Sequence, residues 1–107
     1  MNNQKFTPLQ IAIILLVVAT AAVHLALGVP NGLPMFILNG IGYLVLVAAL
    51  YLPQLRQYQT YTRWALILYT AVTIIGWVAI GARNMVGYAD KLIEVALIAC
   101  LFIEGRK

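Results

Sequence analysis

The chain has 107 residues, of which 64% are hydrophobic and only 9% are charged. This charge is too small to cover the surface of a water-soluble domain, so the composition excludes one and predicts that the chain lies in lipid. The net charge of +4 comes from seven scattered Lys and Arg residues that mostly flank apolar segments, so we expect no nucleic-acid partner.

The predicted elements are four membrane-spanning helices, which fill residues 1–107 as a single transmembrane domain. A spanning helix needs about 20 mainly apolar residues. We predict these helices at about residues 9–27, 35–52, 64–80 and 88–103. Thr7 can cap the first helix, and Pro8 suits its first turn. The fold class is therefore all-α, an antiparallel bundle of four transmembrane helices.

The three predicted connections differ in length and polarity. Gly28 to Pro34 contains two prolines and two glycines without any charge, which predicts that the first helix ends at about Leu27, before a tight hairpin. Residues 53–63 are polar, and we expect them to form a connection outside the membrane. Residues 81–87 are expected to turn the chain into the fourth helix.

Basic residues near the helix ends predict the orientation, because Lys and Arg stay on the cytoplasmic side during insertion. One side of the predicted bundle has Lys5, Arg56, Arg63, Arg106 and Lys107. The other side has only Arg83 and Lys91. We therefore expect both termini in the cytoplasm.

Polar side chains inside the predicted spans gather at one level. Each helix has one at a depth of about 6 to 9 Å from the outer end, at ~1.5 Å per residue, and further polar residues follow on the same face, as Thr20 precedes His24. We therefore predict a buried cluster of polar side chains. Its members are His24, Asn39, Tyr43, Asp90 and Glu94, with Arg83 or Lys91 as a counter-charge.

Several interpretations of this cluster are open. In the structural one, Glu94 and His24 satisfy each other and hold the helices in register, while Asp90 suits the helix dipole and Lys91 extends outward. In the functional one, Glu94 and His24 carry a proton or bind a cation.

Metal and haem binding have weaker support in the sequence. His24, Asp90 and Glu94 are ligand types that suit zinc or manganese, but they match no spacing motif. A single His gives a haem only one axial ligand. We therefore predict no metal, no cofactor and no catalytic residues.

Three segments resemble a pattern found in small, uncharacterised four-span membrane proteins of bacteria and archaea. These segments are His24–Gly28, Phe36–Pro53 and Gly87–Leu97. The resemblance covers nearly the whole chain and implies the fold and a multi-pass location in the prokaryotic inner membrane. It implies no activity, and its matching polar positions are His24, Asn39, Asp90, Lys91 and Glu94.

The chain is also similar in length and span count to small multidrug-resistance transporters. It departs from them because its first helix has His24 and no glutamate. The bias of its basic residues to one side also argues against the dual topology that some of those proteins use.

We expect a non-catalytic integral membrane protein whose partners are the lipid bilayer and other membrane subunits or further copies of itself. Its role would be that of an accessory or assembly subunit, or of a homo-oligomer. The sequence has no recognisable catalytic nucleophile, phosphate loop or metal motif, so we predict that it is not an enzyme. The alternative is a small proton- or cation-coupled transporter or channel-like protein that uses Glu94 and His24.

Overall fold

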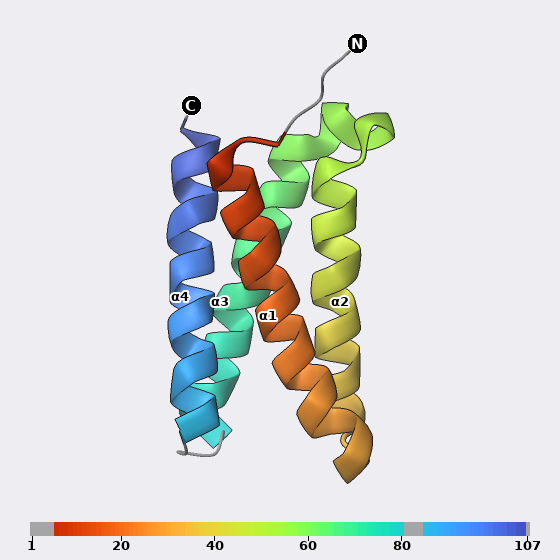
Figure 1. Cartoon of the computed structure of the whole chain (residues 1–107), viewed down its shortest axis with the longest axis vertical. Helices are drawn as coiled ribbons and strands as arrows, with labels where there is room; N and C mark the ends of the chain where they lie inside the picture. The colour runs from red at the N-terminus through yellow and green to blue at the C-terminus, as the bar shows by residue number, and fades with distance from the viewer. Residues whose placement is uncertain (1–5, 81–84, 107) are drawn as a thin grey trace.

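The computed structural model describes residues 6–80 and 85–106. This part of the chain is all-helical. It consists of α1 (Pro8–Asn31), α2 (Pro34–Tyr51), the short 3₁₀ helix η1 (Pro53–Tyr58), α3 (Gln59–Ile80) and α4 (Met85–Gly105). The α-helices run alternately up and down, so α1 begins and α4 ends at the same end of the bundle, which we call the terminal end (Figure 1).

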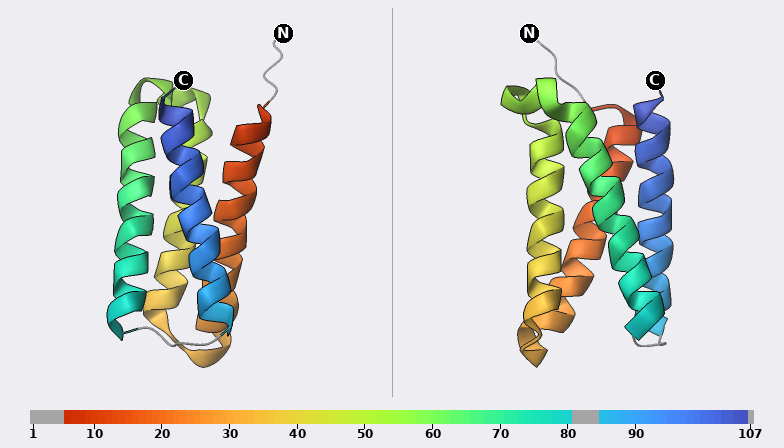
Figure 2. Two further views of the ribbon diagram at one scale, coloured as in Figure 1. Left: turned by 90° about the vertical axis from the view of Figure 1, so that its left-hand side faces the viewer. Right: turned by 180° about the vertical axis from the view of Figure 1, so that it is seen from behind.

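The four α-helices form a closed ring. Helix α1 packs against α2 and α4, and α3 packs against the same two helices on the far side (Figure 2). The bundle measures 45 × 24 × 21 Å. Polar side chains on any helix face that points inward therefore meet those of the other three helices.

Helix α1 continues past the end predicted at about Leu27, so that prediction was wrong. The helix ends at Asn31, although Pro30 lies in its last turn. The Gly28 carbonyl accepts a hydrogen bond from the N–H of Gly32, which adopts the left-handed conformation with φ 61°. The helix can continue because the carbonyl groups of its last turn find partners, and only two residues then separate it from α2.

The prediction of a long polar connection over residues 53–63 was also wrong. The chain forms η1 there, and α3 begins at Gln59, well before the predicted start at residue 64. The Gln59 side chain donates to the carbonyl of Leu50 at 3.1 Å and so caps the end of α2. Hydropathy did not predict η1 or the first turns of α3, because it identifies helices that contact lipid. A helix can also form from polar residues outside the lipid.

Helix α4 is longer than predicted at both ends. It was expected over residues 88–103 and extends over Met85–Gly105. Residues 85–87, which were assigned to a turn, belong to its first turn. The remainder of that predicted turn, including Arg83, lies outside the described residues.

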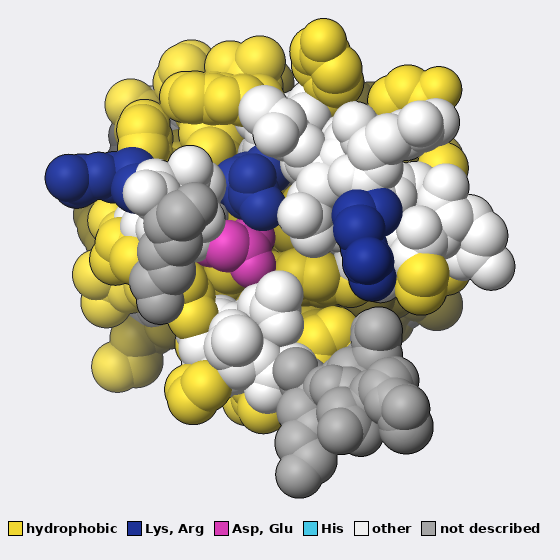
Figure 3. Space-filling view, turned by 90° about the horizontal axis from the view of Figure 1, so that it is seen from above, with side chains coloured by type: hydrophobic (Ala, Val, Ile, Leu, Met, Phe, Trp, Pro, Cys, Tyr) yellow, Lys and Arg dark blue, Asp and Glu magenta, His cyan; other side chains and the backbone are white. Residues whose placement is uncertain are grey.

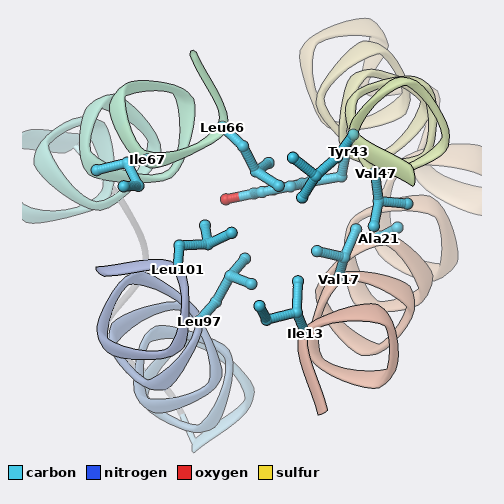
Figure 4. Close-up of a cluster of buried hydrophobic side chains, with 10 residues drawn as sticks. Ile13, Val17, Ala21, Tyr43, Val47, Leu66, Ile67, Leu97 and Leu101 are labelled. Carbon is cyan, nitrogen blue, oxygen red and sulfur yellow. The ribbon is translucent and has the colours of Figure 1, made fainter. Parts of the chain in front are cut away.

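The buried side chains divide the core along its length. Nearer the terminal end they form an apolar cluster to which every α-helix contributes (Figure 4). Its members include Ile13, Val17, Ala21, Tyr43, Val47, Leu66, Ile67, Leu97 and Leu101. On α4 the buried positions Asp90, Glu94, Leu97 and Leu101 form one stripe. This stripe changes from acidic to apolar along the helix, so the polar part of the core lies towards the end away from the termini.

The outer surface of the bundle is apolar. By length and composition, three segments of the described chain can cross a membrane: Pro8–Asn31, Pro34–Tyr51 and Pro53–Ala79. Seen from the terminal end, basic side chains spread over the face with an acidic side chain among them, and hydrophobic side chains surround the rim (Figure 3). On this end face the charged side chains therefore lie inside a hydrophobic rim.

Candidate functional site

Two acids on α4 form the centre of the buried polar cluster. Asp90 and Glu94 lie one helical turn apart and are only 3% and 0% exposed. The hydroxyl of Thr20 on α1 lies between them, 2.6 Å from Oδ1 of Asp90 and 3.1 Å from Oε2 of Glu94. The phenol of Tyr43 on α2 donates to the same Glu94 oxygen at 2.8 Å. The two carboxyl groups thus join α4 to both α1 and α2.

Lys91 supplies a positive charge to this pair. Its ammonium lies 3.2 Å from Oδ2 of Asp90 and also bonds with Oε1 of Glu94. The interpretation in which Lys91 extends outward is therefore wrong, and the counter-charge interpretation describes its position. Arg83, the other expected counter-charge, lies outside the described residues.

His24 is buried on the α1 side of the cluster, with 6% of its surface exposed. Its Nδ1 lies 2.8 Å from the carbonyl oxygen of Thr20, and because a carbonyl can only accept, Nδ1 carries the hydrogen. The same nitrogen is 3.8 Å from Oδ2 of Asp90. His24 and Glu94 were expected to form a hydrogen bond with each other. In the structure, His24 bonds to the Thr20 carbonyl, and Glu94 bonds to Thr20, Tyr43 and Lys91.

Asn39 is separate from the carboxyl pair. Its Nδ2 donates to the hydroxyl of Thr73 on α3 at 3.0 Å. Its backbone carbonyl accepts a hydrogen bond from the Tyr69 phenol at 2.7 Å. Its Oδ1 is buried and has no hydrogen-bond partner among the residues that the structure describes. Asn39 therefore belongs to the contact between α2 and α3, although the sequence grouped it with the acids.

A cavity of about 440 Å³ adjoins the cluster and is lined by residues from all four α-helices. Its polar lining includes His24, Asn39, Thr73, Asp90 and Lys91, and its walls include the aromatic rings of Phe36 and Trp77. Glu94 does not line it. The cavity therefore gives access to one side of the cluster, and Glu94 lies beneath it.

A second polar cluster lies near the terminal end and was missed from the sequence. Arg63 on α3 pairs with Glu104 on α4 at 3.1 Å, and the Tyr51 phenol on α2 donates to Glu104 at 2.9 Å. The sequence pattern indicated only a role in membrane orientation for Arg63. The available signal was Glu104, an acid near the end of α4 at the level where α3 begins.

No protein-family model, curated protein or solved structure matches this chain. The chemistry of the site must therefore be inferred from its geometry. The geometry brings one imidazole, two carboxyl groups and one ammonium together beside a cavity.

Proposed function

We propose that this chain is an integral membrane protein with four spans and with both termini in the cytoplasm. Three described segments have the length and composition of spans. Helix α4 is more polar, but Asp90 and Glu94 are buried inside the bundle, while outward positions such as Leu92 and Val95 are exposed and apolar. This pattern, with charge inside and apolar side chains outside, suits a helix that contacts lipid.

We further propose that the protein is not an enzyme and acts by association, as a homo-oligomer or as a subunit of a larger membrane complex. The observation that carries this proposal is the closed environment of Glu94. Glu94 is wholly buried, and its carboxyl group is bonded to Thr20, Tyr43 and Lys91. Groups bonded in this way hold helices together, and they leave the apolar outer faces as the surface for partners.

The outward face of α3 is one such surface. Leu68, Val72 and Ile75 follow one another at helical spacing and are all exposed. A small bundle has much of its surface on such faces, where lipid and other membrane proteins compete for contact. We expect a partner helix or a second copy to pack there.

The test is to purify the protein under gentle conditions. The tagged chain would be extracted with its surrounding lipid by a styrene–maleic acid copolymer, and native mass spectrometry would identify what remains bound. We expect either a stoichiometric set of membrane proteins or a defined homo-oligomer. The variant Ile75→Trp should weaken the assembly, and Leu92→Trp on the outer face of α4 is the matched control. A protein that is monomeric under all these conditions contradicts the proposal.

Transport of protons or cations is a second candidate, and the cavity is the observation that favours it. His24, Asp90 and Lys91 line this cavity, so ions that enter it reach the cluster. Beyond the cluster the apolar core fills the bundle towards the terminal end (Figure 4). Transport therefore needs a change in helix packing that opens this core.

Flux measurements test this second candidate. The purified protein would be placed in liposomes that contain a pH-sensitive dye, and an imposed pH gradient should decay faster than in empty liposomes. Glu94→Gln and His24→Ala should abolish the difference, whereas Glu104→Gln at the other end of α4 should keep it. A gradient that decays equally in protein-containing and empty liposomes contradicts proton transport.

A further inference from the structure

The buried cluster has two acids and one amine among the described residues. Asp90 and Glu94 offer two negative charges, and the ammonium of Lys91 offers one positive charge. The hydrogen on Nδ1 of His24 belongs to the neutral and to the charged ring alike, so the hydrogen bond to Thr20 does not by itself add a second positive charge. Buried charges are stable only when they are compensated. A divalent cation between the two carboxylates would balance both of them, whereas an ammonium balances one.

The donor atoms are already close together. One ring nitrogen of His24 and one oxygen each of Asp90 and Glu94 lie within 4.8 Å of one another. Bonds of about 2.0–2.2 Å to a tetrahedral zinc ion set its ligand atoms about 3.4 Å apart. The most distant of these atoms must therefore come about 1.4 Å closer together to reach the separation that a zinc ion of this geometry sets.

His24 makes the hydrogen bond that a metal-binding histidine usually makes. Such residues donate one ring N–H to a carbonyl or carboxylate, which leaves the other nitrogen to bind the metal. Here Nδ1 donates to the Thr20 carbonyl and is also the nitrogen that lies 3.8 Å from Oδ2 of Asp90, so the ring must turn to bring Nε2 towards the acids. The His24 side chain is 8% exposed and lines the cavity, which gives the ring space to turn.

We propose that His24, Asp90 and Glu94 form a binding site for a divalent transition-metal ion of the zinc type. One imidazole and two carboxylates are ligands that zinc accepts, and three protein ligands leave a fourth position for water. Lys91 competes with the metal, because its ammonium now bridges the same two carboxylates. Lys91 also lines the cavity, which gives its side chain space to withdraw when a metal enters.

This site goes beyond the proposed function, because association through the outer faces requires no metal. The two proposals also fail separately. A metal-free oligomer would overturn only the site, and a zinc-binding monomer would overturn only the association.

The experiment measures zinc binding to the purified protein in lipid nanodiscs, with an affinity tag that contains no histidine. Competition with a zinc-sensitive dye gives the affinity, and elemental mass spectrometry gives the stoichiometry. We expect one zinc ion per chain. His24→Ala and Glu94→Gln should each weaken binding at least tenfold. Lys91→Met should tighten it at least tenfold, because the competing ammonium is gone.

The Lys91→Met variant keeps the test decisive, since misfolding cannot raise affinity. Glu104→Gln is the matched control, because it neutralises an acid on the same helix outside the site, and its zinc affinity should equal that of the wild type. Absence of saturable zinc binding in both the wild type and Lys91→Met would overturn the proposal. So would binding that His24→Ala leaves unchanged.

Discussion

At the scale of the residue, Tyr43 shows how one side chain joins the two parts of the core. Its ring packs edge-on against Tyr69 with ring centroids 4.8 Å apart, while its phenol donates to Glu94. Tyr43→Phe keeps the ring and removes the donor to a buried carboxylate. We expect it to lower the free energy of unfolding by about 1–2 kcal/mol. Unfolding in mixed detergent and SDS micelles, followed by circular dichroism, measures this change.

Tyr58→Phe is the matched control for Tyr43→Phe. Tyr58 is exposed in η1, so the loss of its hydroxyl should leave the stability unchanged. Equal losses in the two variants would show that the Tyr43 hydrogen bond contributes nothing specific. A drop well above that of one hydrogen bond would show that the ring has moved and that the acid pair has lost more than one donor.

The sequence predicted more about the level of the polar residues than about their partners. Counting residues from the helix ends placed His24 and Glu94 at one depth, and the four-residue spacing placed Asp90 on the same face as Glu94. The structure has donor atoms of all three within 4.8 Å. The count could not show that Lys91 turns inward or that Asn39 bonds to Thr73. Those contacts depend on how far each helix is rotated about its own axis, which depth along the helix does not determine.

At the scale of the element, hydropathy and the positions of Pro and Gly predicted four helices in the right order, and the structure confirms that the described residues are all-helical. They failed at the ends. Pro30 was expected to stop α1 and is contained in its last turn, and the polar stretch after Pro53 was expected to be a loop and is helical. Hydrogen bonds at the ends of helices decide these boundaries, and apolar patterning carries no information about them.

The packing of α1 on α2 depends on Gly40. A Cβ atom there would lie 2.8 Å from Cγ of Leu25 and 3.0 Å from the carbonyl oxygen of Ala21. The end of a flexible side chain could move away from such a contact, but the backbone of Ala21 cannot. Gly40→Ala should therefore separate the two helices. We expect a net loss of up to about 2 kcal/mol, because overpacking costs about 1–3 kcal/mol and the better helix propensity of Ala offsets about 1 kcal/mol of it.

The matched control for Gly40→Ala is Gly76→Ala on α3. A Cβ atom at Gly76 meets no atom within 4 Å, so this variant should be as stable as the wild type or slightly more stable. The same micelle unfolding assay compares the two. If Gly40→Ala proves at least as stable as Gly76→Ala, the close contact between α1 and α2 is not needed for folding.

At the scale of the whole molecule, the dimensions and the charges together predict how the bundle lies in a membrane. Its longest extent of 45 Å equals the thickness of a bilayer of about 40–45 Å that includes the headgroups. The loops at both ends should therefore reach water. The described arginines lie at the terminal end, in η1, at the start of α3 and after α4. This arrangement favours a cytoplasmic location for that end.

Cysteine labelling tests this orientation, with Cys100→Ser as the background because Cys100 is the single native cysteine. Gln57→Cys places a thiol in η1, and Met85→Cys places one at the opposite end, where the side chain is 84% exposed. A membrane-impermeant maleimide added to intact spheroplasts should label Met85→Cys at once. It should reach Gln57→Cys only after lysis. Labelling of Gln57→Cys alone would reverse the orientation, and labelling of both would mean that the chain inserts both ways and that its basic residues do not direct insertion.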